Sequence, residues 1–537
     1  MHRLVAEILS RRGIPATGGF LDPRLQDLGD PFQLSGMRET VARLLTAIDA
    51  GENVTLYGDY DVDGVASLAL MRAGLVAYGL EPAVTLPHRM DEGYGLSEEG
   101  IARCIAETRP SLLIAIDCGT TSLHEARLLA DRGVDLIILD HHEPGAEGLP
   151  RCVGIVNPKA SGEQSYLCSA GVVFKVLHAL LKSRPLPKDR FDLKRQLDLV
   201  ALATVADIVP LLEENRLLVK HGLRELGTTT RPGLVALKSL VGVGDKPKAG
   251  DVGFKLGPRL NAVGRLDTAR HAYDLLVSGD AAESTELAGL LDEQNKERQH
   301  LEQTILARAM EQAAAQPEAK VLVLAGDDWH PGVVGIVAAR VMRQFHRPCF
   351  VIGFDDHELG KGSARSIPGV SLTALIAACK SFLVKGGGHD MAAGISIHKH
   401  RVDGFRAAIT AEVERTCPPE VFLPTVTADM VVRLADLDHS LLDAWEALAP
   451  FGNSFHEPQL MACGVTPANA PRILKEKHYK FTLCQGDNRI DAIWFQGATK
   501  GTLPPPPWDV IFHLDANEWN GRRSPQMKIE ALRQCPI

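Results

Sequence analysis

The stretch that decides the fold is VTLYGDYDVDG at residues 54–64, an apolar run that ends in three acids and two glycines. Similar short apolar runs recur at 83–87, 112–116 and 136–139, and the segments between them carry apolar residues at three-to-four spacing. Short β-branched strands that alternate with amphipathic helices are typical of a doubly wound parallel sheet. We therefore expect an α/β protein.

At 537 residues the chain exceeds the size of a single hydrophobic core, so we expect several domains. Residues 283–315 contain no proline and predict a long, solvated connecting helix. A second strand–helix alternation follows this helix. Toward the C-terminus, short strands between turn residues predict a β-rich, barrel-like domain. The predicted parts are an N-terminal extension at 1–45, a catalytic α/β domain at 46–282, the connecting helix at 283–315, a second α/β domain at 316–416 and the β-rich domain at 417–537.

The composition places the chain in a broad class. Hydrophobic residues make up 45% and charged residues 23%, which excludes disordered and fibrous proteins. The net charge of −9 is acidic for a nucleic-acid enzyme, but it does not exclude a local basic cleft. The ten cysteines include no C-x-x-C pair, and neither an apolar leader nor a membrane-spanning run is present, so we expect a cytoplasmic protein.

Metal-competent side chains follow three of the predicted strands. Because the carboxyl ends of parallel strands meet at one edge of a sheet, these side chains are expected to share one site. Asp207 lies in the apolar helical run at 199–210 and is its only acid, so it needs a partner if it is buried. The candidates after the three strands are Asp59, Asp61 and Asp63, then Asp117, and then Asp140, His141 and His142.

Each of these residues also has a purely structural explanation. Asp63 precedes a helical run and would serve as its N-cap, which is the better explanation of this residue taken alone. Asp207 could equally be a cap or a salt-bridge partner. Three neighbouring strands that all end in metal-competent residues favour a shared site.

The types of side chain in this set indicate which ions it would bind. Carboxylates with imidazoles and without thiolate favour Mn²⁺ or Mg²⁺ over a structural zinc. Crowded acids without a cation would raise one another's pKa values, and a metal centre removes that conflict. Two cations about 3.5–4 Å apart are the usual apparatus for displacement at phosphorus. The predicted reaction is phosphodiester hydrolysis.

The order D-x-D-G, strand-end Asp, D-H-H and helical Asp resembles the DHH phosphoesterase superfamily. The resemblance implies one cation on Asp61 and Asp117 and a second on Asp63, Asp117, His141 and Asp207. It also implies a catalytic set of Asp117, Asp140 and His142, with His142 beside the scissile phosphate and Asp140 orienting the histidines. Many members have a histidine where this chain has Tyr57, so Asp59 is the expected replacement ligand.

Four further segments resemble the RecJ family of exonucleases: EGYGLS at 92–97, GPRLNAVGR at 257–265, SARSIPGVSL at 363–372 and GGGHDMAAG at 386–394. The likeness implies a DHH domain, a DHHA1 domain and a C-terminal OB-like domain. Taken alone, the glycine-rich segment is better explained as a tight turn, and surface arginines are usually solvated. The implied nucleic-acid contacts are Arg89, Arg259, Asn261, Arg265, Ser363, Arg365, Gly387, Gly388 and His389.

Two features of the C-terminal part remain open at this point. The family's glycine–asparagine turn after P-F-G is altered here to PFGNSFHEP at 450–458. Phe481, Trp494 and Trp519 could stack on bases, although core packing is the more common role of such residues.

The resemblance implies a 5′-to-3′ exonuclease that uses two Mn²⁺ or Mg²⁺ ions to degrade single-stranded DNA to 5′-mononucleotides in repair and recombination. It further implies a monomer that works with single-strand-binding protein and a RecQ-type helicase on DNA with a 5′ end. One alternative is a phosphodiesterase or oligoribonuclease for small substrates, which would share every metal ligand. The other is a DNA-binding scaffold without catalysis.

Overall fold

The computed structural model describes residues 2–15, 18–87, 95–162, 166–266, 269–519 and 521–536. The chain forms two compact units, Met1–Gly257 with Val426–Ile537, and Pro258–Thr425. Over these described segments, no helix combines the length and apolar character that crossing a membrane requires.

The first sheet has five parallel strands in the order β2-β1-β3-β4-β5. Every residue of β1 and β3 is buried, as expected for strands that are covered on both faces. The predicted strands at 54–58 and 112–116 coincide with β1 and β3. The strands are β1 (Val54–Gly58), β2 (Ala83–Thr85), β3 (Leu112–Ile116), β4 (Asp135–Leu139) and β5 (Gly154–Val156).

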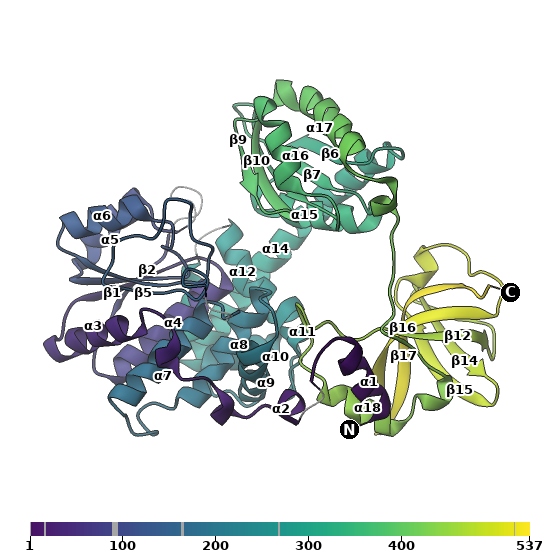
Figure 1. Cartoon of the computed structure of the whole chain (residues 1–537), viewed down its shortest axis with the longest axis horizontal. Helices are drawn as coiled ribbons and strands as arrows, with labels where there is room; N and C mark the ends of the chain where they lie inside the picture. Colours follow the sequence, from purple (N-terminus) through teal and green to yellow (C-terminus); the bar gives the residue numbers. More distant parts are fainter. Residues whose placement is uncertain are drawn as a thin grey trace. The chain divides into compact units, whose positions relative to one another are not determined.

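Helices cover both faces of this sheet (Figure 1). On one face lie α5 (Glu98–Thr108) and α6 (Leu123–Asp131), and on the other lie α3 (Met37–Ala50), α4 (Val62–Ala77) and α7 (Ser169–Ser183). This arrangement confirms the predicted doubly wound architecture. The helices that follow are α8 (Leu197–Ala206), which packs on α4, then α9 (Glu213–Gly227), α10 (Pro232–Leu240) and α11 (Ala249–Asp251).

The second unit combines a long helix with a mixed sheet. The helix α14 spans Ala281–Ala314, close to the predicted 283–315, and the sheet order is β6-β7-β8-β10-β9. The other helices are α12 (Gly257–Leu266), α13 (Arg270–Val277), α15 (Pro331–Phe345), α16 (Leu372–Ala378) and α17 (Val402–Thr416). The strands are β6 (Leu322–Asp327), β7 (Cys349–Phe354), β8 (Leu359–Arg365), β9 (Lys385–Gly388) and β10 (Ala392–His398).

The C-terminal sheet has seven strands in the order β11-β12-β16-β17-β15-β14-β13, and an additional β12–β14 pairing closes it. This closure agrees with the predicted barrel-like domain. Phe481 and Trp494 are buried in its core, so packing is the role that the structure supports for both. The strands are β11 (Met430–Val431), β12 (Leu460–Pro467), β13 (Arg472–Leu474), β14 (His478–Gln485), β15 (Asn488–Trp494), β16 (Trp508–Trp519) and β17 (Arg522–Gln534), and one helix, α18 (His439–Ala447), packs beside them.

The N-terminal segment contains α1 (Arg3–Arg11) and α2 (Gly18–Leu21). The apolar face of α1 joins the core of the C-terminal barrel through Leu4, Val5 and Ile8, and α1 packs against α18. The first helix of the chain therefore completes a core that the last hundred residues build.

Candidate metal centre

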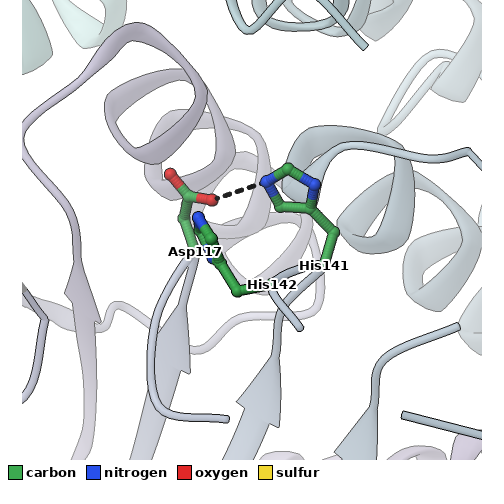
Figure 2. Close-up of side chains that lie close together, drawn as sticks. All are labelled: Asp117, His141 and His142. Carbon is green, nitrogen blue, oxygen red and sulfur yellow. Dashed lines mark ion pairs between the residues drawn. The ribbon is translucent and has the colours of Figure 1, made fainter. Parts of the chain in front are cut away.

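The site lies at the carboxyl ends of three adjacent strands. Because β3 is paired with β1 on one side and with β4 on the other, the segments that follow these strands meet at one sheet edge. Figure 2 shows the His141 ring facing the Asp117 carboxylate, with the His142 ring alongside. The structure thus brings together residues that are separated by tens of positions in sequence.

The His141 imidazole lies at the centre of the acid cluster. Its Nε2 atom is 3.4 Å from Asp117 Oδ1, 3.5 Å from Asp207 Oδ2 and 3.7 Å from Asp63 Oδ2. These separations are longer than ordinary hydrogen bonds, and potential ligand atoms of Asp63, His141 and Asp207 lie within 4.8 Å of one another, as do those of Asp117, His141 and His142. Burial lowers the pKa of His141 to about 3, so the ring is uncharged at neutral pH, the form that binds metals.

Asp61 and Asp63, which follow β1, have structural roles that differ from the prediction. Asp61, not Asp63, is the N-cap of α4, because its carboxylate accepts a hydrogen bond from the Gly64 N–H at 3.0 Å. Asp63 lies in the first turn of α4 and is buried, and its carboxylate accepts the N–H groups of Ser169 at 2.7 Å and Ala170 at 2.8 Å. The start of α7 therefore holds Asp63 in place.

Gly64 allows the acids after β1 to approach one another. A Cβ atom at this position would lie 2.4 Å from the Asp59 carbonyl oxygen. Carboxylate oxygens of Asp59, Asp61 and Asp117 lie within 4.8 Å of one another. Tyr57, at the position where the resemblance led us to expect a histidine in many members, is fully buried and donates a hydrogen bond to the Gly95 carbonyl at 3.3 Å. A carboxylate trio thus occupies the place of the expected first metal site.

Asp117 is held in an unusual backbone conformation. Its φ of +63° falls in the left-handed region, which non-glycine residues adopt mainly where the surroundings enforce it, often at functional sites. The Ser169 hydroxyl donates a hydrogen bond of 2.8 Å to Asp117 Oδ1. Burial and the negative charge of Asp63 raise the pKa of Asp117 well above its usual range.

The charged forms of these acids destabilise one another, and a bound cation would relieve this repulsion. Burial and the charge of Asp61 raise the pKa of Asp63 to about 6, and burial with the charges of Asp63 and Asp61 raises the pKa of Asp207 to about 8. Buried carboxylates that face an uncharged imidazole form a donor set suited to a hard or borderline divalent ion. The residues present therefore fit a metal centre.

Asp140 organises the second histidine. Its carboxylate accepts hydrogen bonds from His142 Nδ1 at 2.7 Å, from the backbone N–H of His141 at 2.8 Å and from Thr120 Oγ1 at 2.6 Å. Burial opposes ionisation of His142, but the hydrogen bond and charge of Asp140 outweigh it and raise the pKa of His142. Burial alone would raise the pKa of Asp140. The hydrogen bond from His142 acts against burial and helps to hold this pKa below its usual range. Asp140 thus orients the His142 ring but only the backbone of His141.

Three residues that hold this site were not found from the sequence. Ser169 binds both Asp63 and Asp117, and Thr120 binds Asp140. The Asn157 amide donates to Thr120 Oγ1 at 2.8 Å and to the His142 carbonyl at 2.9 Å. The only sequence signal for Ser169 is its place at the start of the apolar helical run at 169–180; Thr120 and Asn157 lie in loops without any pattern.

The predicted phosphate contacts lie mainly in the second unit. Ser363 and Arg365 are on β8, and Arg365 donates hydrogen bonds to Ser363 Oγ at 3.0 Å and to the Ala364 carbonyl at 2.8 Å. Gly387 and Gly388 end the exposed strand β9, and His389 follows them. Arg259 on α12 forms an ion pair of 2.8 Å with Asp292, and Asn261 lies on the same helix. Arg89 and the side chains of Arg265 and Trp519 are outside the described residues.

Comparison with known domain families divides the chain into three matched regions. The DHH family N-terminal domain matches residues 53–204, the DHHA1 domain matches 318–415 and the RecJ OB domain matches 428–531. The three regions follow the order that the sequence motifs predicted.

Relatives that match nearly the whole chain agree with these domain matches. The chain is 37% identical to the single-stranded-DNA-specific exonuclease RecJ of Bacillus subtilis, over 98% of this chain and 67% of the relative. It is 32% identical to the RecJ of Escherichia coli, over 93% and 90% of the two chains. The crystal structure of Thermus thermophilus RecJ in complex with Mn²⁺ matches with a TM-score of 0.85 and 31% identity, covering 99% of this chain and 76% of that one. The chain therefore belongs to the RecJ family of single-stranded-DNA-specific exonucleases.

Proposed function

We propose that this chain is a metal-dependent exonuclease that hydrolyses single-stranded DNA from its 5′ end to 5′-mononucleotides. The observation that carries the proposal is the convergence of Asp63, Asp117 and Asp207 on His141 Nε2, at 3.4–3.7 Å. Relatives at 30–37% identity are named single-stranded-DNA-specific exonucleases, and two solved structures of the Thermus thermophilus RecJ are complexes with Mn²⁺ and with Mg²⁺. These likenesses support Mn²⁺ or Mg²⁺ as the cofactor and single-stranded DNA as the substrate.

The proposed ligands form two overlapping sets. One cation would be held by Asp61 and Asp117 with Asp59, and the other by Asp63, Asp117, His141 and Asp207, so that Asp117 serves both. Bound there, the pair would supply Lewis acidity and neutralise negative charge at the phosphoryl group. Ser169 holds Asp117 close to Asp63, because its hydroxyl donates a hydrogen bond to Asp117 and its backbone N–H donates one to Asp63.

His142 is the proposed residue beside the scissile phosphate. Its Nδ1 bonds to Asp140 Oδ1, its side chain is 43% exposed, and we assign its Nε2 to the contact with the substrate. Because the raised pKa of His142 favours its protonated form, Nε2–H can donate a hydrogen bond to a phosphate oxygen. Asp140 balances the charge of that imidazolium.

The proposed binding of the 5′ phosphate rests on the second unit. Arg365 and Ser363 lie on β8, which pairs directly with β10, and β10 pairs in turn with the glycine-rich β9. Gly387 and Gly388 are exposed residues, and a glycine-rich strand, a guanidinium and a hydroxyl together suit a phosphate. Arg259 already pairs with Asp292, so we assign it a weaker contribution than Arg365.

A substrate panel tests this proposal. Labelled single-stranded DNA with a 5′ phosphate, the same strand in duplex form, a dinucleotide and pyrophosphate are each incubated with the full chain and Mn²⁺. We expect mononucleotides to be released fastest from the single strand, beginning at its 5′ end. Faster cleavage of the dinucleotide or of pyrophosphate would instead assign the chain to small substrates, and DNA binding without cleavage would make it a scaffold.

The cellular setting is a further part of the proposal. We place the enzyme in the cytoplasm, in DNA repair and recombination, as a monomer that works with single-strand-binding protein and a RecQ-type helicase. Supporting this setting is the need of a single-strand exonuclease for a partner that unwinds duplex DNA. Sedimentation and pull-down with the two purified partners test it.

A further inference from the structure

The segment that follows Asp207 is strained and needs external support. Ile208 has a φ of +59°, in the left-handed region, and its side chain is 68% exposed. A β-branched residue is strongly disfavoured in this region and persists there only where its surroundings hold it. Its own side chain is largely in solvent, so the support must come from backbone contacts of this segment.

Asn453 of the C-terminal domain supplies these contacts. Its Nδ2 donates a hydrogen bond of 2.6 Å to the Ile208 carbonyl, and its own carbonyl accepts the Leu211 N–H at 2.9 Å. A Cβ atom on the neighbouring Gly452 would lie 2.6 Å from Leu211 Cδ1, so the glycine permits this approach. One residue thus binds both ends of the segment 208–211, immediately after the proposed metal ligand.

The loop that carries Asn453 is itself anchored to the catalytic part of the chain. The Arg216 guanidinium, on α9, donates to the carbonyls of Leu448 at 2.6 Å and Pro450 at 3.0 Å, and it lies 4.7 Å from the centre of the Phe455 ring. Burial lowers the pKa of Arg216 to about 10, which still leaves it charged at neutral pH. The loop is therefore fixed on both sides of Asn453.

We propose that Asn453 is a positioning residue for Asp207, so that the C-terminal domain sets the metal affinity of the catalytic centre. Asp207 lies between the end of α8 and the clamped segment, and its carboxylate direction depends on the path of the backbone through Ile208. The PFGNSF loop at 450–455 contributes the donor. This inference rests on the proposed function, in which Asp207 is a ligand.

The test is Mn²⁺ binding to the full chain, measured through the electron paramagnetic resonance signal of the free ion. Asn453→Ala removes the donor, and Asn453→Asp keeps the size but replaces the donor with an acceptor. Both variants should bind Mn²⁺ about fivefold more weakly, the effect of one hydrogen bond. The rate of DNA hydrolysis should fall at low Mn²⁺ and recover at high Mn²⁺, which a general loss of folding would not allow.

Two further variants separate positioning from general destabilisation. Glycine adopts a φ near +59° without strain, so Asn453→Ala combined with Ile208→Gly should bind Mn²⁺ within about twofold of Ile208→Gly alone. Asn488→Ala, at an exposed position of the same domain, should match the wild type. Wild-type affinity in both Asn453 variants would overturn the inference while the metal centre stands. Absence of Mn²⁺ binding by the wild-type chain would overturn the proposed function, and this inference with it.

Discussion

Two clusters of buried charged side chains in this chain are balanced in different ways. On α14, Glu302 is 1% exposed and forms ion pairs of 2.8 Å with both Arg298 and Arg340. At the strand ends, Asp63 and Asp117 face other acids and the uncharged His141. A buried carboxylate is tolerated where the protein supplies its counter-charge, and its pKa rises where acids accumulate. The first cluster is neutralised within the protein and stabilises the fold. The second has an excess of acids, which a cation from solution would neutralise.

Asp117→Ala should give the largest effect, because it removes the carboxylate that both proposed cations share. We expect hydrolysis of single-stranded DNA to fall about a thousandfold, since metal ions contribute several kcal/mol to such transition states. DNA binding, measured by fluorescence anisotropy, should persist. Asp131→Ala, an exposed aspartate at the end of α6, serves as the control. Hydrolysis within threefold of the wild type would reject the shared-ligand role.

Glu302→Ala tests the balanced cluster. Removing this acid leaves Arg298 buried without its counter-charge, which should lower the free energy of unfolding by about 3–5 kcal/mol. Urea denaturation measures the loss, and Glu297→Ala, exposed on the same helix, is the matched control. Mn²⁺ affinity should not change. A clear loss of Mn²⁺ binding would mean that the two clusters are not independent.

Ser169→Ala probes the support of the acid cluster. The substitution removes the 2.8 Å hydrogen bond to Asp117 but keeps the helix start that binds Asp63. Mn²⁺ affinity should fall about tenfold, the lower range for residues that orient metal ligands. Calorimetric titration gives the value, with Ser183→Ala at the exposed end of the same helix as control. Unchanged affinity would contradict the role of the Ser169 hydroxyl in holding Asp117.

The pH dependence of stability should be the smallest effect. The pKa values of Asp63 and Asp207 are raised, to about 6 and about 8, above the value near 4 of an unfolded chain. Their stabilising contribution is therefore complete below about pH 4 and is lost as pH rises through 6 and 8. In chelator, the melting temperature should fall by a few degrees between pH 5 and 9.

Excess Mn²⁺ should remove this fall, and Asp207→Asn should remove its upper part even in chelator. A metal-free melting temperature that stays constant from pH 5 to 9 would contradict the raised pKa values. It would also weaken the contrast with Glu302, whose charge the protein already balances.

The sequence by itself determined the α/β class, the parallel strands and the kinds of side chain at their ends. These features follow from local periodicity and from the rule that parallel strands present their carboxyl ends together. For the same reason, Asp117 and His141 could be named before their geometry was known, and Asp207 could be named as the only acid in an apolar helical run. The motif order also identified the family.

Only the tertiary structure decided which neighbours each of these residues meets. It made Asp61 the helix cap and Asp63 the residue held by α7, and it gave Arg259 a partner in Asp292. It also placed Asn453 against the segment 208–211, which follows the proposed ligand Asp207. The segments carrying Asn453 and Ile208 are 245 residues apart. Contacts over such separations depend on how whole elements pack, and no local pattern of apolar, polar or turn residues encodes them.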